Sequence, residues 1–382
     1  MLLLKRATIY PQTQEKPFLG DILCKEGKIA HIAETIESDA PSLDLDGLNV
    51  LPGLIDCHTH IGLHYPDNLT ALEYISECTR PVTPHLRIAH GVDPGSPYFP
   101  YAVKNGVTTV GIIPGSTNVL GGIGFASKTW GSHISEMTIR ESICVKAALG
   151  ENPKGFYQEK DMEPDSRMGV TFLIAEALHD ARDYLREKEN DSLLFKKEEM
   201  EALIPVLKRE IPLRVHCTHN DMASIIEIVR EFNIKFTLEH AWGSLNYLDE
   251  IVESGCAIVY GPIGGRRSFY ESRRTDISAV KPLDERGVTV ALTTDAPIYG
   301  LDGLIHHMEE AVRQGTPVER AMRMITINPA AILGVEQRVG SIEVGKDANF
   351  AVFQGVPGKD MGAHVTHAIC EGRLGYEYAG LR

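Results

Sequence analysis

From Leu51 onward, the sequence alternates short apolar segments with stretches that have the period of an amphipathic helix. Such alternation predicts parallel strands joined by helices, because two parallel neighbours need a long crossover connection. Seven apolar segments are clear and "IGFASKTW" is a weaker eighth; the others are "LPGLIDCHTH", "VTTVGIIP", "SICVKAAL", "PLRVHC", "IKFTLEHA", "CAIVYGP" and "VTVALTTDAP". Eight such strands between residues 51 and 334 predict a (β/α)8 TIM barrel of the α/β class.

The two ends of the chain have a different pattern. Residues 1–50 contain short alternating runs that begin with "LLLKRATIY", and β character returns in "GSIEVGKDANFAVFQG" and "HVTHAICEGRLGYEY". We predict that residues 1–50 and 335–382 form one small composite β-sandwich domain, which the barrel at 51–334 interrupts. The first apolar run is too short before Lys5 for a membrane span and is typical of a first strand.

Composition narrows the choice of partners. The chain has a formal net charge of −14 with scattered Lys and Arg residues, which argues against binding to nucleic acid or to an anionic membrane. Its 7 cysteines are irregularly spaced and contain no C-x-x-C pair, which favours a reducing compartment and predicts a cytoplasmic protein. We therefore expect a small-molecule substrate, and we expect the chain to form a homo-oligomer.

Polar side chains gather where the predicted barrel strands end. His58 and His60 end the first strand, and three later strands end at His216, His240 and Asp295. The carboxyl ends of barrel strands form the face on which catalytic groups lie. Two residues with a spacing of two point to the same side of a strand, about 6 to 7 Å apart between Cα atoms. His58 and His60 can therefore both reach one divalent ion.

Each of these residues also has an ordinary structural explanation. A single histidine at a strand end is more often a hydrogen-bonded core or rim residue than a metal ligand. The joint pattern of four histidines and one aspartate at strand ends nevertheless favours a metal site. Asp56 shares the alternation of the two histidines deeper in the barrel, and we expect it to support them.

The segments "PGLIDCHTH", "INPAAILG" and "GSIEVGKDANFAVF", together with the strand-end residues, resemble the amidohydrolase superfamily over nearly the whole chain. Within that superfamily the sequence is similar to the imidazolonepropionase-like group, and "KAALGENPK" resembles one of its subgroups. The resemblance implies a metal-bearing barrel with a β-sandwich built from both termini. It also implies that the metal ligands are His58, His60, His216, His240 and Asp295.

The function implied is metal-dependent hydrolysis of a carbon–nitrogen bond, in an amide or in a cyclic amide such as an imidazolone-like ring. A divalent cation lowers the pKa of its water from 15.7 to about 7, which makes hydroxide available at neutral pH. Asp295 is the expected catalytic residue, which takes a proton from this water and passes it to the departing nitrogen. Zinc is the expected ion, with iron or manganese as alternatives. Hydrolytic deamination of an amino-heterocycle and a binding or scaffold role without turnover both stay open.

Lys146 lies in the fourth predicted strand. Whether the site holds one ion or two depends on the state of this side chain. The resemblance implies a carbamylated lysine that bridges two metals, because an unmodified ammonium would repel a nearby cation. Alternatively, the stem of Lys146 packs in the barrel while its amine meets water or a carboxylate such as Glu151. Glu151 is also a candidate metal ligand in its own right.

Three residues are candidates for substrate binding. His64 and Tyr65 follow the first strand in "IGLHYPD", where a solvated loop pair is the alternative, and His219 follows the predicted ligand His216 in "HCTH". Relatives in the subgroup often have His-Ala-His-Arg at this last position, so the neighbours of the metal histidine differ here. The glycine-rich segment "GSTNVLGGIGFAS" lacks the G-x-G-x-x-G spacing, and we expect it to form a flexible loop over the site.

Overall fold

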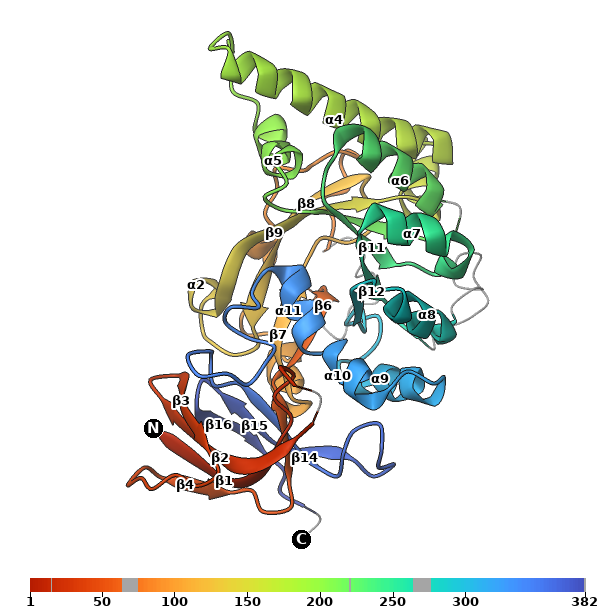
Figure 1. The fold of residues 1–382 in the computed structure, drawn as a ribbon. Helices are drawn as coiled ribbons and strands as arrows, with labels where there is room; N and C mark the ends of the chain where they lie inside the picture. The colour runs from red at the N-terminus through yellow and green to blue at the C-terminus, as the bar shows by residue number, and fades with distance from the viewer. Residues whose placement is uncertain (15, 64–74, 220, 264–275, 381–382) are drawn as a thin grey trace.

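The structure is a computed structural model that describes residues 1–14, 16–63, 75–219, 221–263 and 276–380. Its strands form two sheets of eight strands each (Figure 1). The barrel sheet consists, in spatial order, of β6 (Leu54–Thr59), β7 (Val107–Ile112), β8 (Leu120–Lys128), β9 (Thr138–Ala148), β10 (Leu213–Cys217), β11 (Phe236–His240), β12 (Ala257–Tyr260) and β13 (Val290–Leu292). Because β13 also contacts β6, the sheet is nearly closed and has the form of a TIM-type barrel.

Strand β8 departs from the predicted fold. It pairs antiparallel with both β7 and β9, whereas β6 with β7 and the successive pairs from β9 to β13 are parallel. Residues 113–119, all of them described, form an irregular loop rather than a helix, and only the short α2 (Ile134–Met137) follows β8. The weak eighth strand is therefore confirmed, but the barrel is not a regular (β/α)8 barrel, because antiparallel neighbours need no crossover helix.

The glycines of the segment around β8 allow other chain segments to pack closely against it. A Cβ atom on Gly124 would lie 2.6 Å from Cγ2 of Ile113. Gly122 has a φ of +126°, and a Cβ atom there would lie 2.5 Å from the carbonyl oxygen of Leu86. The expectation of a flexible glycine-rich loop was thus wrong, since most of this segment is a barrel strand that requires glycine for steric reasons.

Helices cover the outside of the barrel, as Figure 1 shows. Besides α2, the helices in the described part of the chain are α1 (Tyr98–Lys104), α3 (Glu151–Gln158), α4 (Arg167–Glu189), α5 (Glu198–Leu207), α6 (Asp221–Phe232), α7 (Leu248–Ser254), α8 (Val280–Glu285), α9 (Gly303–Arg313), α10 (Val318–Arg323) and α11 (Ile327–Leu333), with short 3₁₀ helices η2 (Ile88–Gly91), η3 (Ser244–Tyr247) and η5 (Ile277–Ala279). None of the described helices combines the length and the apolar composition that crossing a membrane requires.

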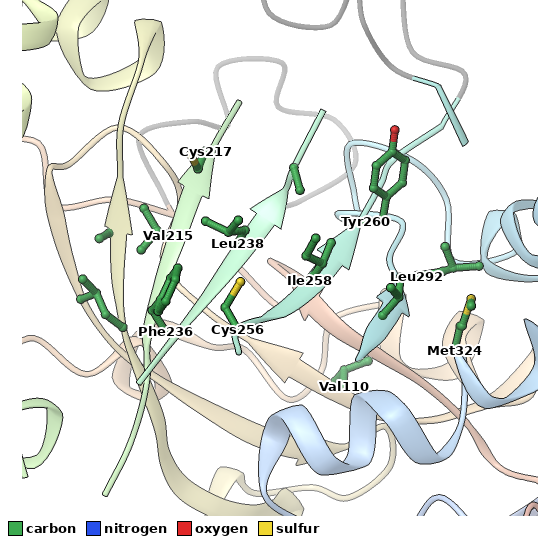
Figure 2. Packing of buried hydrophobic residues seen from close by; sticks show 14 of the residues in the cluster. Val110, Val215, Cys217, Phe236, Leu238, Cys256, Ile258, Tyr260, Leu292 and Met324 are labelled. Carbon is green, nitrogen blue, oxygen red and sulfur yellow. The ribbon is translucent and has the colours of Figure 1, made fainter. Parts of the chain in front are cut away.

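Alternate side chains of the barrel strands form the main apolar core. Figure 2 shows this layer across four successive strands, with Val215, Leu238, Ile258 and Leu292. All four side chains are buried in a cluster that also contains residues of α6, α8 and α9. His216 and Glu239 are the next residues after two of them, so the period of two directs these polar side chains to the opposite face of the sheet.

Both ends of the chain contribute to the second sheet. Its strands are β1 (Leu2–Ile9), β2 (Phe18–Lys25), β3 (Lys28–Ala33), β4 (Ser42–Asp44), β5 (Asn49–Pro52), β14 (Phe350–Gln354), β15 (His364–Cys370) and β16 (Arg373–Glu377). The expected first strand is confirmed as β1, and β5 joins the two halves by pairing antiparallel with β14. An apolar cluster that includes Ile22, Val50 and Phe350 packs on this sheet. The two-layered sandwich and the domain boundaries at 50 and 335 stay predictions.

Candidate metal centre

The end of β6 places two imidazoles beside a carboxylate at the carboxyl face of the barrel. His58 and His60 are buried, and their Nε2 atoms lie 3.5 and 3.1 Å from Oδ1 of Asp295, which follows β13. One donor atom from each of the three residues lies within 4.8 Å of the others. Residues separated by more than 230 positions in the sequence are thus close enough to hold one ion.

In three of the imidazole rings, a hydrogen-bond acceptor lies beside Nδ1. Nδ1 of His60 lies 2.8 Å from the carbonyl oxygen of Ile113, and Nδ1 of His240 lies 2.6 Å from that of Gly261. Nδ1 of His58 lies 2.6 Å from Oε2 of Glu239. Carbonyl and carboxylate oxygens only accept hydrogen bonds, so each Nδ1 carries the hydrogen and each Nε2 has a free lone pair. This is the usual arrangement of a metal-binding histidine, and the rings therefore fit a divalent cation.

His240 and His216 lie beside this group. The ring centroids of His58 and His240 are 5.0 Å apart, and those of His216 and His240 are 4.6 Å apart. Nε2 of His216 is also 3.5 Å from Nδ2 of Asn152 in α3. The structure therefore gathers all four predicted histidines and Asp295 at one place, although the tightest group within the described residues contains only His58, His60 and Asp295.

Two of these residues have an unusual backbone conformation. His240 has a φ of +67° and Asp295 a φ of +56°, which is the left-handed region that residues with a side chain rarely adopt. Such conformations cost about 1 to 3 kcal/mol each and gather at functional sites. The strain at both strand ends agrees with a site whose geometry is held by the surrounding structure.

Asp56 supports the site through backbone N–H groups and two threonine hydroxyls rather than through the imidazoles. Its Oδ1 accepts hydrogen bonds from Thr293 Oγ1 at 2.6 Å and from the N–H of His58 at 3.2 Å. Its Oδ2 accepts from the N–H and the hydroxyl of Thr294 at 2.9 and 2.6 Å. Asp56 therefore ties the end of β6 to the two residues that precede Asp295.

Burial sets the protonation of the site. It lowers the pKa of His58 to about 4 and that of His240 to about 3, so both rings are neutral at pH 7. For Asp295, burial alone would raise the pKa, but the close approach of His60 and of the other neighbouring imidazoles lowers it well below the usual range. Neutral imidazoles and an ionised carboxylate are the forms that bind a metal ion.

Lys146 is buried within β9, and its Nζ lies 3.5 Å from the carbonyl oxygen of Gly115. Burial lowers the pKa of this amine to about 8. Glu151, which we considered as its partner or as a ligand, pairs with Lys154 at 3.2 Å and with Arg167 at 3.1 Å. The number of ions, and the modification of Lys146, therefore stay open.

The three candidates for substrate binding are not tested by this geometry. His64 and Tyr65 lie outside the described residues. His219 follows β10 with a φ of +49°, and its N–H donates to the carbonyl oxygen of Trp242 at 2.9 Å. Its place after the end of a barrel strand agrees with a position near the mouth of the barrel.

Sequence reasoning missed the charged pair next to His58. Arg214 and Glu239 are both completely buried, and Arg214 donates two hydrogen bonds to the Glu239 carboxylate. A charged residue inside each of the buried strands "LRVHC" and "FTLEH" was a usable signal, because a buried charge requires a partner. The identity of that partner could not be read from either strand alone.

Comparison with known proteins agrees with this geometry. A sequence model of the Amidohydrolase family matches residues 49–374. The crystal structure of an amidohydrolase from Thermotoga maritima MSB8 is 33% identical, covers 99% of this chain and 100% of its own, and superposes with a TM-score of 0.94.

More distant relatives point to the same chemistry. Imidazolonepropionase from Shewanella sp. (strain MR-4) is 26% identical over 375 residues, which are 87% of this chain and 86% of that protein. Amidohydrolase tasK from Hapsidospora irregularis is 26% identical over 89% of this chain, but the match spans only 38% of tasK. The chain belongs to the amidohydrolase family and is a hydrolase that acts on carbon–nitrogen bonds.

Proposed function

We propose that this chain hydrolyses an amide or cyclic amide bond of a small molecule with a divalent metal ion held by His58, His60, His216, His240 and Asp295. The observation that carries the proposal is the convergence of His58, His60 and Asp295 within 4.8 Å. Nitrogen and carboxylate ligands of this kind suit zinc, and iron or manganese are the alternatives.

Asp295 has the central chemical role in this proposal. When bound, a divalent cation lowers the pKa of its water to about 7 and polarises a carbonyl group. The ionised carboxylate of Asp295 accepts a proton from the attacking water and delivers it to the departing nitrogen. Nε2 of His60 and Nε2 of His58 lie 3.1 and 3.5 Å from its Oδ1, so the carboxylate and both ring nitrogens face the same place.

The family relatives support a cyclic amide as the substrate. Proteins named imidazolonepropionase match most of this chain at 26% identity, so we propose a ring of the imidazolone type as the first class to test. His64, Tyr65 and His219 are proposed to contact the substrate at the mouth of the barrel. Asn152 joins this proposal, because its amide lies between Ser116 Oγ at 2.7 Å and Nε2 of His216 at 3.5 Å.

A second ion is proposed as the alternative to a mononuclear site. The lowered pKa of Lys146, about 8, leaves part of the amine uncharged near neutral pH, which carbamylation by carbon dioxide requires. If Lys146 instead stays a plain amine, one ion fills the site. The cytoplasmic location and the homo-oligomer stay predictions.

The proposal is tested with purified protein that has been stripped of metal and reloaded with zinc. We expect ring opening or amine release from members of a panel of amides, lactams and imidazolones, and no turnover after chelation or in the His60→Ala variant. Ammonia release from amino-heterocycles would favour a deaminase instead. A protein that binds no zinc at this site would overturn the proposal.

A further inference from the structure

The Arg214–Glu239 pair is built into the barrel interior beside His58. Nε and Nη2 of Arg214 donate to Oε1 and Oε2 of Glu239 at 2.8 and 2.6 Å, which is a two-pronged contact. Nη1 of the same guanidinium donates to the carbonyl oxygen of Cys57 at 2.7 Å. The side chains of both partners are 0% exposed. A buried arginine thus links β10, β11 and the strand that carries His58.

Glu239 uses both carboxylate oxygens to hold its neighbours. Oε1 accepts a hydrogen bond from Thr237 Oγ1 in addition to that from Arg214. Oε2 is shared between Arg214 Nη2 and His58 Nδ1, each at 2.6 Å. With donors on both oxygens, the carboxylate has one orientation, and that orientation presents an acceptor to His58.

We infer that the Arg214–Glu239 pair is a positioning device that fixes the tautomer and the ring orientation of His58, so that Nε2 offers its lone pair to the metal ion. This inference rests on the metal site proposed above. A neutral imidazole carries its hydrogen on either nitrogen. An acceptor that is always ionised and always at Nδ1 holds the hydrogen there, and a carboxylate partner makes the ring a stronger ligand.

A purely structural role does not explain the pair well. Replacing a buried ion pair by apolar residues of similar volume is often neutral or stabilising, because the charges must lose their hydration. His60 and His240 obtain their orientation from backbone carbonyl oxygens, without a buried charge. Among these three rings, in the contacts that the structure describes, only His58 has an ionised group as the acceptor beside its Nδ1.

The test compares variants that remove the pair with a variant that restores only the acceptor. The Arg214→Met/Glu239→Leu variant lacks both charges and the acceptor. The Arg214→Met/Glu239→Gln variant lacks the charges but keeps an oxygen that accepts from Nδ1. The matched control is Arg320→Met/Asp284→Leu, which removes a side-chain ion pair between α8 and α10.

Two readouts separate positioning from stability. The first is the zinc affinity of the metal-free protein, measured by competition with a chromophoric chelator beside thermal unfolding. The second is the nitrogen NMR spectrum of metal-free protein labelled in histidine, which reports which ring nitrogen of His58 carries the hydrogen. We expect the Met/Leu variant to keep its thermal stability and to bind zinc about 10- to 100-fold more weakly. In its NMR spectrum, His58 should no longer be present only as the tautomer with the hydrogen on Nδ1. The Met/Gln variant should recover most of the zinc affinity and of the Nδ1–H tautomer of His58. The control variant should change neither the zinc affinity nor the tautomer.

Each result decides the inference. Wild-type zinc affinity in a folded Met/Leu variant would overturn it while leaving the metal site intact. If wild-type protein itself binds no zinc at the site, the proposed function fails, and the tautomer in metal-free protein still decides whether the pair positions His58. Should the Met/Leu variant not fold, Arg214→Lys replaces it, because lysine keeps the charge but not the two-pronged geometry. An unchanged His58 spectrum and zinc affinity in that variant would then overturn the inference.

Discussion

The metal-free protein is predicted to lose stability on mild acidification through two buried imidazoles. The pKa values of His58 and His240 are lowered by burial from 6.5 to about 4 and about 3. Between these values and 6.5 the unfolded chain binds protons that the folded protein does not. Stability therefore rises with pH across this window and is lost as the pH falls below 6.5.

The size of the effect follows from the shift. At pH 5, which lies 1.5 units below 6.5, each unfolded imidazole gains about 2 kcal/mol relative to the folded one, at about 1.36 kcal/mol per unit. The two residues together contribute about 4 kcal/mol, a large part of the 5 to 15 kcal/mol that typically stabilises a protein.

Urea denaturation of metal-free protein at pH 7.5 and pH 5 measures this loss. The His58→Gln/His240→Gln variant, which cannot titrate at these positions, should lose about 4 kcal/mol less than wild type between the two pH values. His306→Gln is the matched control, because His306 is 67% exposed and should leave the wild-type pH dependence unchanged. Equal losses in wild type and in the double glutamine variant would refute the reasoning.

Three further outcomes follow from the site. His58→Ala or His60→Ala should lower the zinc content measured by elemental analysis and abolish turnover with an unchanged circular dichroism spectrum; full zinc occupancy in the double variant would show that these residues are not ligands. Asp295→Asn keeps the shape but removes the proton acceptor, so kcat should fall by about 100-fold or more, and near-normal kcat would remove Asp295 from the mechanism. If Lys146 is a carbamylated bridge, wild type should hold two metals per chain and Lys146→Ala one or none, with reconstitution stimulated by bicarbonate; one metal in wild type and an unmodified amine by mass spectrometry of the intact protein would exclude the bridge.

The sequence predicted that five side chains gather at one place, because two simple geometric rules determine this. The five are His58, His60, His216, His240 and Asp295. Alternation along a strand directs residues two apart to the same side, and parallel strands in a barrel bring their carboxyl ends to one face. These rules use only local patterns and the order of strands. They were sufficient for the candidate ligands, although not for their roles.

Strand β8 shows that a local sequence pattern does not specify the direction of a strand or its neighbours. An apolar run has the same pattern in either direction, so "IGFASKTW" predicted a strand but not its antiparallel pairing with β7 and β9. Its glycines suggested a flexible loop, whereas the space they leave is filled by Ile113 and by the backbone at Leu86. Both errors concern tertiary neighbours, which a single strand does not specify.

The positions around the ligands were harder to predict for a related reason. Arg214 and Glu239 are 25 residues apart on neighbouring strands, and their pairing depends on the barrel register, which places His216 beside Glu239. Asp56 was expected to support the histidines, but its partners include two threonines before Asp295, more than 230 residues away. Contacts of this kind are set by closure of the sheet rather than by sequence spacing.

The most direct test of the account is anomalous X-ray diffraction at the zinc edge from crystals of zinc-loaded protein. We expect an anomalous peak that marks a zinc ion about 2.0 to 2.1 Å from Nε2 of both His58 and His60, with the Asp295 carboxylate as a further ligand. We also expect that Nδ1 of His58 stays on Glu239. A zinc ion bound elsewhere, with these three side chains free of metal at full loading, would contradict the account.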